Sequence, residues 1–367
     1  FLQFIQKKEI VVPKKLSIVY ILFILFSALA TFISINTDRS FSYLLFYISL
    51  FLIFNYVLNN TEAIKKYIIP YIFGLSFLLT IYSVFLKYLI QNNIWSLIPE
   101  HGYQFVFPKF GLHNHLGDFL ILPLTICSYY LVKGKSKLLP ILGILFFIPF
   151  LIFSYSRSAY VSVILTCFLL FFAMKRAGQA ISKKFIVAIA CIIVVLASFF
   201  LFTMSETQVF KSDVVEKKMT LTPRLNFFYD AVRSMIDSPF GVGPNNYVYI
   251  SGKYSQLTRY FSYSSHNIFF DVLVENGIFA SVFFIYFIYL IIKRSDDTSV
   301  IFFCFLATLI NFQTDYTHNI YSYILLFFVL MALVYRQKKI VYSKIILLFA
   351  FLLFLATQYI YFSRLIL

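Results

Sequence analysis

Long apolar segments constrain this chain more than any other feature of its sequence. About eleven of them are long enough, or nearly so, to cross a bilayer core of roughly 30 Å. Several are short for a span, so tilt or flanking aromatic residues must make up the difference. Because 61% of the residues are hydrophobic and only 13% are charged, we predict an all-α polytopic membrane protein. The predicted spans are 16–35, 41–58, 67–89, 115–132, 138–153, 159–174, 185–203, 278–292, 299–314, 319–335 and 343–362.

The basic residues predict the orientation of these spans. Of the 31 Lys and Arg residues, 19 lie in alternate loops on one side of the membrane. Lys and Arg are enriched in cytoplasmic loops, so we expect the long polar loop 204–266 to be extracytoplasmic. The net charge of +16 is therefore a topology signal, and nucleic acid is a poor candidate partner. The 19 residues are Lys7, Lys8, Lys14, Lys15, Lys65, Lys66, Lys133, Lys135, Lys137, Lys175, Arg176, Lys183, Lys184, Lys293, Arg294, Arg336, Lys338, Lys339 and Lys344.

We expect a single integral membrane domain over residues 1–367, because no linker rich in Gly, Ser or Pro interrupts the chain. All four cysteines fall inside predicted spans, so we expect neither a disulfide framework nor a Cys-based metal site. The sequence starts with Phe1 and a short apolar stub before Lys7 and Lys8. We interpret this start as the end of a missing upstream span, with a cleaved signal peptide as the alternative.

The polar loop contains a predicted amphipathic helix. Thr222 is a suitable N-cap, Pro223 suits the first helical position, and 237–241 ends the helix. A second short helix is expected to start after Ser264 or Ser265 and to end at 276–277. The apolar face of the first helix is expected to comprise Leu225, Phe228, Val232, Met235 and Ile236, and its polar face Asn226, Asp230, Arg233 and Asp237.

Two arginines are candidates for binding an anionic substrate. Arg157 occupies a tight hairpin, residues 154–158, where a guanidinium is costly unless an anion pairs with it. It either snorkels to lipid phosphate or clamps a substrate phosphate with its bidentate fork. Arg224 has the same two interpretations, as an interfacial anchor or as part of an anion site at a helix N-terminus.

His266 is the candidate for catalysis. It is the only histidine of the polar loop and stands where the loop is predicted to re-enter the membrane. An isolated histidine is more often structural, but at this boundary its pKa can suit a general base. His113, Asn267 and Arg233 are secondary candidates, and His115 and His318 are weaker ones. No Asp-x-Asp pair lies in an outer loop, so we expect no metal and no cofactor.

Several short motifs occur in an order that resembles the O-antigen ligase and polymerase family of bacterial envelope glycosyltransferases. The resemblance covers roughly residues 105–335, and its order and spacing are more specific than any single motif. The motifs are Phe110-Gly111-Leu112-His113-Asn114, Ser156-Arg157-Ser158, Pro223-Arg224, Ser238-Pro239-Phe240-Gly241-Val242-Gly243, Ser265-His266-Asn267 and Glu275-Asn276-Gly277.

This resemblance implies a many-span helical protein of the bacterial cytoplasmic (inner) membrane, with one large extracytoplasmic loop over its site. It implies a polyprenyl-diphosphate-linked glycan as donor and an acceptor hydroxyl on a glycan, a lipid or a lipid A-core, without a metal. The family's two diphosphate-binding arginines correspond to Arg157 and Arg224, and its essential histidine to His266. About twelve spans are usual in the family, so about eleven here fits a missing N-terminal span.

Three alternatives stay open at this point. A polymerase of lipid-linked repeat units would need the same donor site as a ligase. A transporter or flippase of lipid-linked sugars should place charges near the middle of its spans, whereas here only Asp118 and Asp271 come close. A purely structural membrane protein would explain neither Arg157 nor the loop that carries Arg224 and His266.

The topology predicts which loops an impermeant thiol reagent can label. In intact cells Lys253→Cys should react and Lys184→Cys should not, because only the first is expected outside. Labelling is read by mass shift, with permeabilised cells as the control in which both react. Reaction of Lys184→Cys alone in intact cells would reverse the topology.

Overall fold

The computed structural model of this protein describes most of its predicted helical segments. It describes residues 10–11, 13–91, 113–133, 137–154, 156–178, 198, 221–254, 262–336 and 341–342. Six helices in these ranges are long and apolar enough to cross a membrane, and three shorter helices are also apolar. The prediction of a helical, multi-pass membrane protein is therefore confirmed. The predicted spans 185–203 and 343–362, Cys191 and the motif 110–112 lie outside the described residues, apart from position 198, and the total of about eleven spans stays a prediction.

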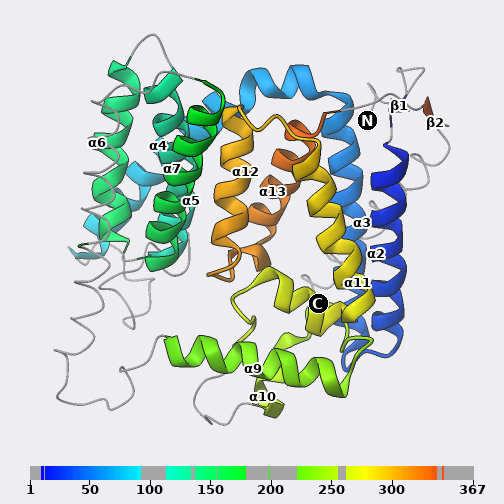
Figure 1. Ribbon diagram of the computed structural model, residues 1–367. Helices are drawn as coiled ribbons and strands as arrows, with labels where there is room; N and C mark the ends of the chain where they lie inside the picture. Colours follow the sequence, from blue (N-terminus) through cyan, green and yellow to red (C-terminus); the bar gives the residue numbers. More distant parts are fainter. Residues whose placement is uncertain are drawn as a thin grey trace. The chain divides into compact units, whose positions relative to one another are not determined.

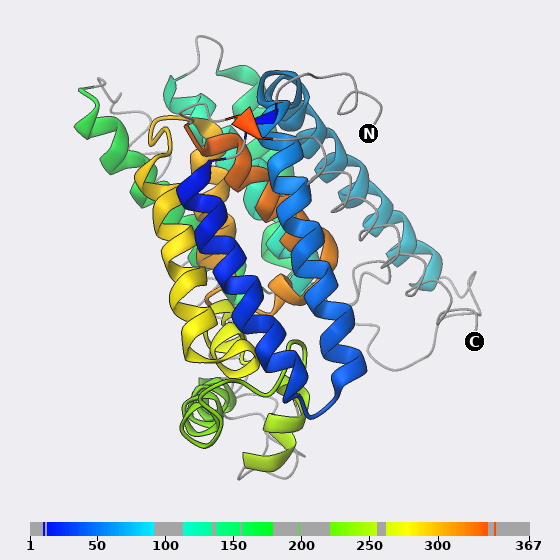
Figure 2. The same cartoon turned by 90° about the vertical axis from the view of Figure 1, so that its right-hand side faces the viewer.

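The chain divides into two compact units, and each is described by itself. The first unit comprises residues 1–62, 219–296 and 318–367. In both views of the molecule its helices α2, α3 and α11 lie side by side, and α9 runs across one end of them (Figures 1 and 2). The elements of this unit are β1 (Ile10–Val11), α2 (Lys14–Phe32), α3 (Thr37–Asn59), α9 (Leu221–Asp237), α10 (Tyr247–Tyr254), α11 (Ile268–Lys293), α13 (Tyr321–Val334) and β2 (Val341–Tyr342).

Aromatic side chains form the core of the first unit. The ring of Tyr20 in α2 stacks on Phe51 of α3 with 4.7 Å between centroids, and it also meets Phe287 of α11 at 4.9 Å. Its buried hydroxyl donates to the carbonyl of Tyr47 at 3.0 Å, so the polar end of this ring is satisfied inside the bundle. The two short strands pair antiparallel, with Ile10 opposite Tyr342.

The second unit comprises residues 63–218 and 297–317. Its core is formed by fully buried side chains that include Leu116, Phe147, Leu151 and Tyr160. Helix α5 approaches the turn between α6 and α7 so closely at Gly117 that a Cβ there would collide with Ser154. The helices of this unit are most of α4 (Thr61–Gln91), α5 (His113–Lys133), α6 (Leu138–Phe153), α7 (Arg157–Arg176) and α12 (Val300–Asn311).

Two details of the predicted loop helices are wrong. Helix α9 begins at Leu221, so Thr222 lies inside it rather than capping it. The second helix is capped by Asn267, whose Oδ1 accepts from the backbone N–H groups of Phe269 and Phe270 at 3.0 and 3.2 Å, and not by Ser264 or Ser265. Both serines are instead engaged with a carboxylate, described below. The predicted ends, at 237 for α9 and at the break near 277, are confirmed.

The buried side of α9 coincides with neither of its two predicted faces. Leu225 and Ile236 are 61% and 70% exposed, whereas Asp230 is buried with Phe227 and Ala231. The inward face is set by the neighbours Tyr247 and Val274, against which Phe227 and the small Ala231 pack. The apolar residues of the outer face are left for an apolar environment outside the unit.

A helix break at Gly277 joins two of the sequence motifs. Gly277 has φ 82° and ψ 174°, so the carbonyls of Val274 and Glu275 lose their helical partners. The N–H groups of Val242 and Gly243 donate to these carbonyls at 3.0 and 2.9 Å, and Ile278 N–H donates to the carbonyl of Pro239 at 3.0 Å. The segment 239–243 therefore replaces the missing hydrogen bonds of α11, and the motifs 238–243 and 275–277 form one structural element.

Gly277→Ala should destabilise the protein strongly. Its backbone conformation is nearly exclusive to glycine, which costs about 1–3 kcal/mol for other residues, and an added Cβ would meet the backbone of Phe240. We expect the thermal unfolding midpoint in detergent to fall by at least several degrees.

Gly74→Ala in α4 is the matched control for this substitution. Nothing lies within 4 Å of an added Cβ there, and alanine favours a helix by up to about 1 kcal/mol. This variant should unfold at the same temperature or slightly higher. Equal midpoints for Gly277→Ala and the wild type would contradict the account of the helix break.

Candidate functional site

His266 lies in a tight turn that immediately precedes α11. Its φ of 61° is in the left-handed region, which a residue with a side chain adopts only when its surroundings hold it there. Its N–H donates to Ser264 Oγ at 2.9 Å. Ser264 Oγ in turn donates to Asp271 Oδ2 at 2.5 Å, and Ser265 N–H donates to Asp271 Oδ1 at 2.6 Å. These hydrogen bonds hold the loop at His266 against the N-terminal end of α11.

The ring of His266 lies on helix α9. It stacks on the ring of Phe227, with 5.6 Å between centroids and 13° between planes. Phe227 is itself held, because its carbonyl accepts from the buried hydroxyl of Tyr247 at 2.9 Å. Arg224 lies three residues before Phe227 in the same helix, and residues three apart share a face of an α-helix. The backbone thus places the positions of two predicted site residues near each other, although the side chain of Arg224 is outside the described ones.

Arg157 lies in the second unit, as the first residue of α7. Ser156 caps the helix, because its Oγ accepts from Ala159 N–H at 3.3 Å. Ser156 Oγ and Ser158 Oγ lie 3.0 and 3.1 Å from the same atom, Asp118 Oδ1. The residues on both sides of Arg157 are therefore pinned to one buried carboxylate, and Arg157 itself is half-buried.

Sequence reasoning missed most of the polar network around Asp118. Asn311 Nδ2 donates to Asp118 Oδ1 at 3.0 Å, and Ser158 Oγ also lies 2.9 Å from Asp315 Oδ2. Ser158 has one hydroxyl hydrogen, so it serves one carboxylate at a time. Of the residues in this network, the sequence pattern indicated Asp118, because it is an acid within a predicted span. Asn311 and Asp315 follow it by nearly 200 residues, and no local pattern indicated the pairing.

The secondary candidates have different surroundings. Asn267 is the N-cap of α11, a structural role. Arg233 is exposed on α9 and lies over the ring of Tyr254 at 5.7 Å. His113 is the first residue of α5, and its side chain is outside the described ones. The meeting of Arg157 with Arg224 and His266 at one site stays a prediction.

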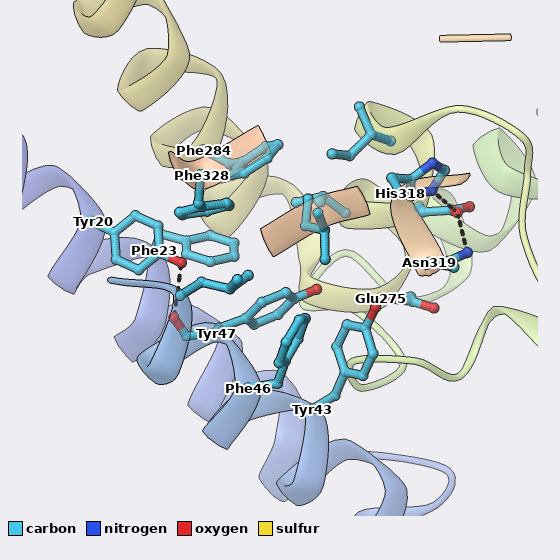
Figure 3. A pocket seen from close by; sticks show the side chains of 15 residues that line it. Tyr20, Phe23, Tyr43, Phe46, Tyr47, Glu275, Phe284, His318, Asn319 and Phe328 are labelled. Carbon is cyan, nitrogen blue, oxygen red and sulfur yellow. Dashed lines mark hydrogen bonds and ion pairs between the residues drawn. The ribbon is translucent and has the colours of Figure 1, made fainter. Parts of the chain in front are cut away.

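A narrow pocket in the first unit is lined in part by Asp271. Figure 3 shows Tyr20, Tyr43 and Tyr47 on one side, with Glu275 and His318 at its polar end. Its free space holds only about two water molecules, so it does not admit a sugar ring as it stands. Among the residues that the structure describes, no group of three or more His, Cys, Asp or Glu side chains is placed to hold a metal ion.

Asp230 is the one acid on the buried face of α9. Burial raises its pKa to about 6, against a smaller lowering by Arg233. Within the described part of the chain, its Oδ2 has no hydrogen-bond partner. Together with Leu225, Asn226 and Tyr229 it lines an open hollow beside the first turns of α9.

Comparison with known proteins gives one match. Residues 142–285 match the family model described as O-antigen ligase. This range contains Arg157, Arg224 and His266, and it confirms the family resemblance for the motifs that lie within it. Searches of curated proteins and of solved structures found no match to the chain.

The raised pKa of Asp230 predicts that Asp230→Asn increases the stability of the fold by an amount that depends on pH. The folded protein disfavours the ionised Asp230 carboxylate. The resulting loss of folding stability is absent below about pH 4, grows as the pH rises through 6 and reaches its full size above that. The variant should equal the wild type near pH 4 and be more stable by about 1–3 kcal/mol at pH 7.5. Asp237→Asn, at an exposed position of the same helix, should show no such gain. A difference in unfolding temperature between Asp230→Asn and the wild type that does not change with pH would contradict the raised pKa of Asp230.

Proposed function

Residues 142–285 are similar to the O-antigen ligase family, and on this premise we propose that the chain is a glycosyltransferase of the bacterial cytoplasmic membrane. It moves a glycan from a polyprenyl-diphosphate carrier to an acceptor hydroxyl at the outer face of that membrane. The observation that carries the proposal is the family match, because its range includes Arg157, Arg224 and His266. The description of the family favours a ligase over a polymerase of repeat units, which would use the same donor.

Arg157 and Arg224 bind the diphosphate of the donor in this proposal. Guanidinium groups meet phosphate oxygens in a bidentate fork and stay charged at any relevant pH. The bond between the anomeric carbon and the diphosphate breaks during transfer, so negative charge grows on the leaving group, and two fixed cations stabilise it without a divalent metal. The firm attachment of the Ser156–Ser158 backbone supports this role for Arg157, because a held cation needs no reorganisation during the reaction.

His266 acts on the acceptor. It accepts the proton of the attacking hydroxyl while the hydroxyl oxygen forms the new bond to the anomeric carbon. A single displacement of this kind inverts the configuration at that carbon. The stacking of the His266 ring on Phe227, three residues after Arg224, supports a position close to the donor phosphates.

Arg157→Lys separates a phosphate clamp from a lipid anchor. Lysine keeps the charge but lacks the fork, so release of polyprenyl diphosphate from the lipid-linked donor should fall by at least about tenfold. An anchor would tolerate lysine, because its side chain also snorkels. Release is measured by chromatography on membranes containing the protein, with EDTA present throughout.

Arg176→Lys, at the opposite end of α7, is the control and should keep wild-type activity. His266→Ala should stop transfer while the donor still binds. Wild-type rates in both Arg157→Lys and His266→Ala, at normal expression, would refute the proposed site. A rate that depends on added Mg²⁺ or Mn²⁺ would refute its independence of metal.

A further inference from the structure

Asp271 has more hydrogen-bond donors around its carboxylate than a helix cap needs. It is 3% exposed and belongs to the first turn of α11. Besides Ser264 and Ser265, it is approached by His318 Nε2 at 2.7 Å and Asn319 Nδ2 at 3.4 Å, both contacting Oδ2 (Figure 3). A buried carboxylate is tolerated in a membrane-spanning helix only with such partners.

His318 supplies the compensating partner of this carboxylate. Both side chains are nearly inaccessible, with 4% and 5% of their surface exposed, so water competes little for the hydrogen bond between them. Asn319 adds a donor from the next residue along the chain. Removing His318 would leave Asp271 with three neutral donors, whereas a neutral donor in its place would keep the geometry.

The bonds of Asp271 lead directly to the backbone of His266. The carboxylate orients Ser264 Oγ, and that oxygen accepts from His266 N–H. Ser265 N–H is bound by the other carboxylate oxygen, so both residues before His266 are fixed. Left-handed backbone is unfavourable for an L-residue, so His266 needs such support to keep its φ of 61°.

We infer that Asp271, with His318 as its partner, is the positioning residue that holds the His266 ring against Phe227. The inference rests on the proposed function, because it matters for catalysis only if His266 acts on the acceptor. Asp271 acts through the turn and not on the substrate. It is buried, and the pocket beside it holds only about two water molecules.

A double-mutant cycle tests the link between Asp271 and Ser264. Asp271→Asn should lower transfer by at least about tenfold, and Ser264→Ala by about fivefold, while binding of the lipid-linked donor changes less than about twofold. The double variant should be no slower than Asp271→Asn alone, because both changes break one chain of bonds. Ser281→Ala is the control: this serine is buried inside α11, its hydroxyl donates to the carbonyl of Gly277, and the variant should keep the wild-type rate.

His318 provides a second test by conservative replacement. His318→Gln can still donate to Asp271 and should keep several-fold more activity than His318→Ala, at equal expression and unfolding temperature. If Asp271→Asn fails to fold, Ser264→Ala and the two His318 variants decide the question. Wild-type transfer in folded Ser264→Ala, or equal rates for His318→Gln and His318→Ala, would overturn the inference.

The outcomes for the two proposals are distinguishable. Loss of transfer in His266→Ala together with full transfer in Asp271→Asn would remove the positioning role and leave the proposed function intact. Full transfer in His266→Ala would remove the proposed role of the histidine itself, whatever Asp271→Asn does.

Discussion

A carboxylate inside a membrane-spanning helix must collect hydrogen-bond donors, because the bilayer core offers no water in their place. Asp271 in α11 and Asp118 in α5 both meet this requirement with serines. The serines bound to Asp271 directly precede His266, and those near Asp118 flank Arg157. The need of each acid for donors therefore fixes the backbone of a residue for which the family resemblance predicts a role. Each compact unit thus contains a buried acid whose serine partners adjoin a candidate site residue.

A second constraint comes from the break in α11. A glycine that interrupts a helix leaves backbone groups without partners, and these must be satisfied when they are buried. Here the segment 239–243 supplies the partners, so a loop that would otherwise only connect α9 to α10 becomes part of α11. The segment follows directly after α9 and so helps to position that helix. The ring of His266 stacks on Phe227 of α9. The position of the histidine ring thus depends on Gly277 as well as on Asp271.

Local patterns in the sequence predicted the features that depend on neighbouring residues. Apolar runs gave the spans, the turn before Arg157 followed from its short polar hairpin, and Gly277 followed from glycine's preference for helix ends. What failed depended on residues far apart in the chain. The inward face of α9 is chosen by Tyr247 and Val274, and hydrophobic periodicity alone did not indicate it. The partnership of Asp271 with His318 joins residues 47 positions apart, and no local pattern in the sequence indicated it.

The junction between the polar loop and α11 has a consequence for how such proteins diversify. Exchange of the loop between two relatives, cut at the membrane boundary near His266, would separate the loop from the acceptors that hold it. The carboxylates of Asp271 and Glu275 and the carbonyl of Val274 all belong to the helix that follows. The segment 221–277 contains these three supports, whereas His318, the partner of Asp271, lies beyond it. Recombination or engineered chimeras that respect this boundary should keep the turn at His266 together with the carboxylates that hold it, whereas shorter grafts should combine two halves of different turns.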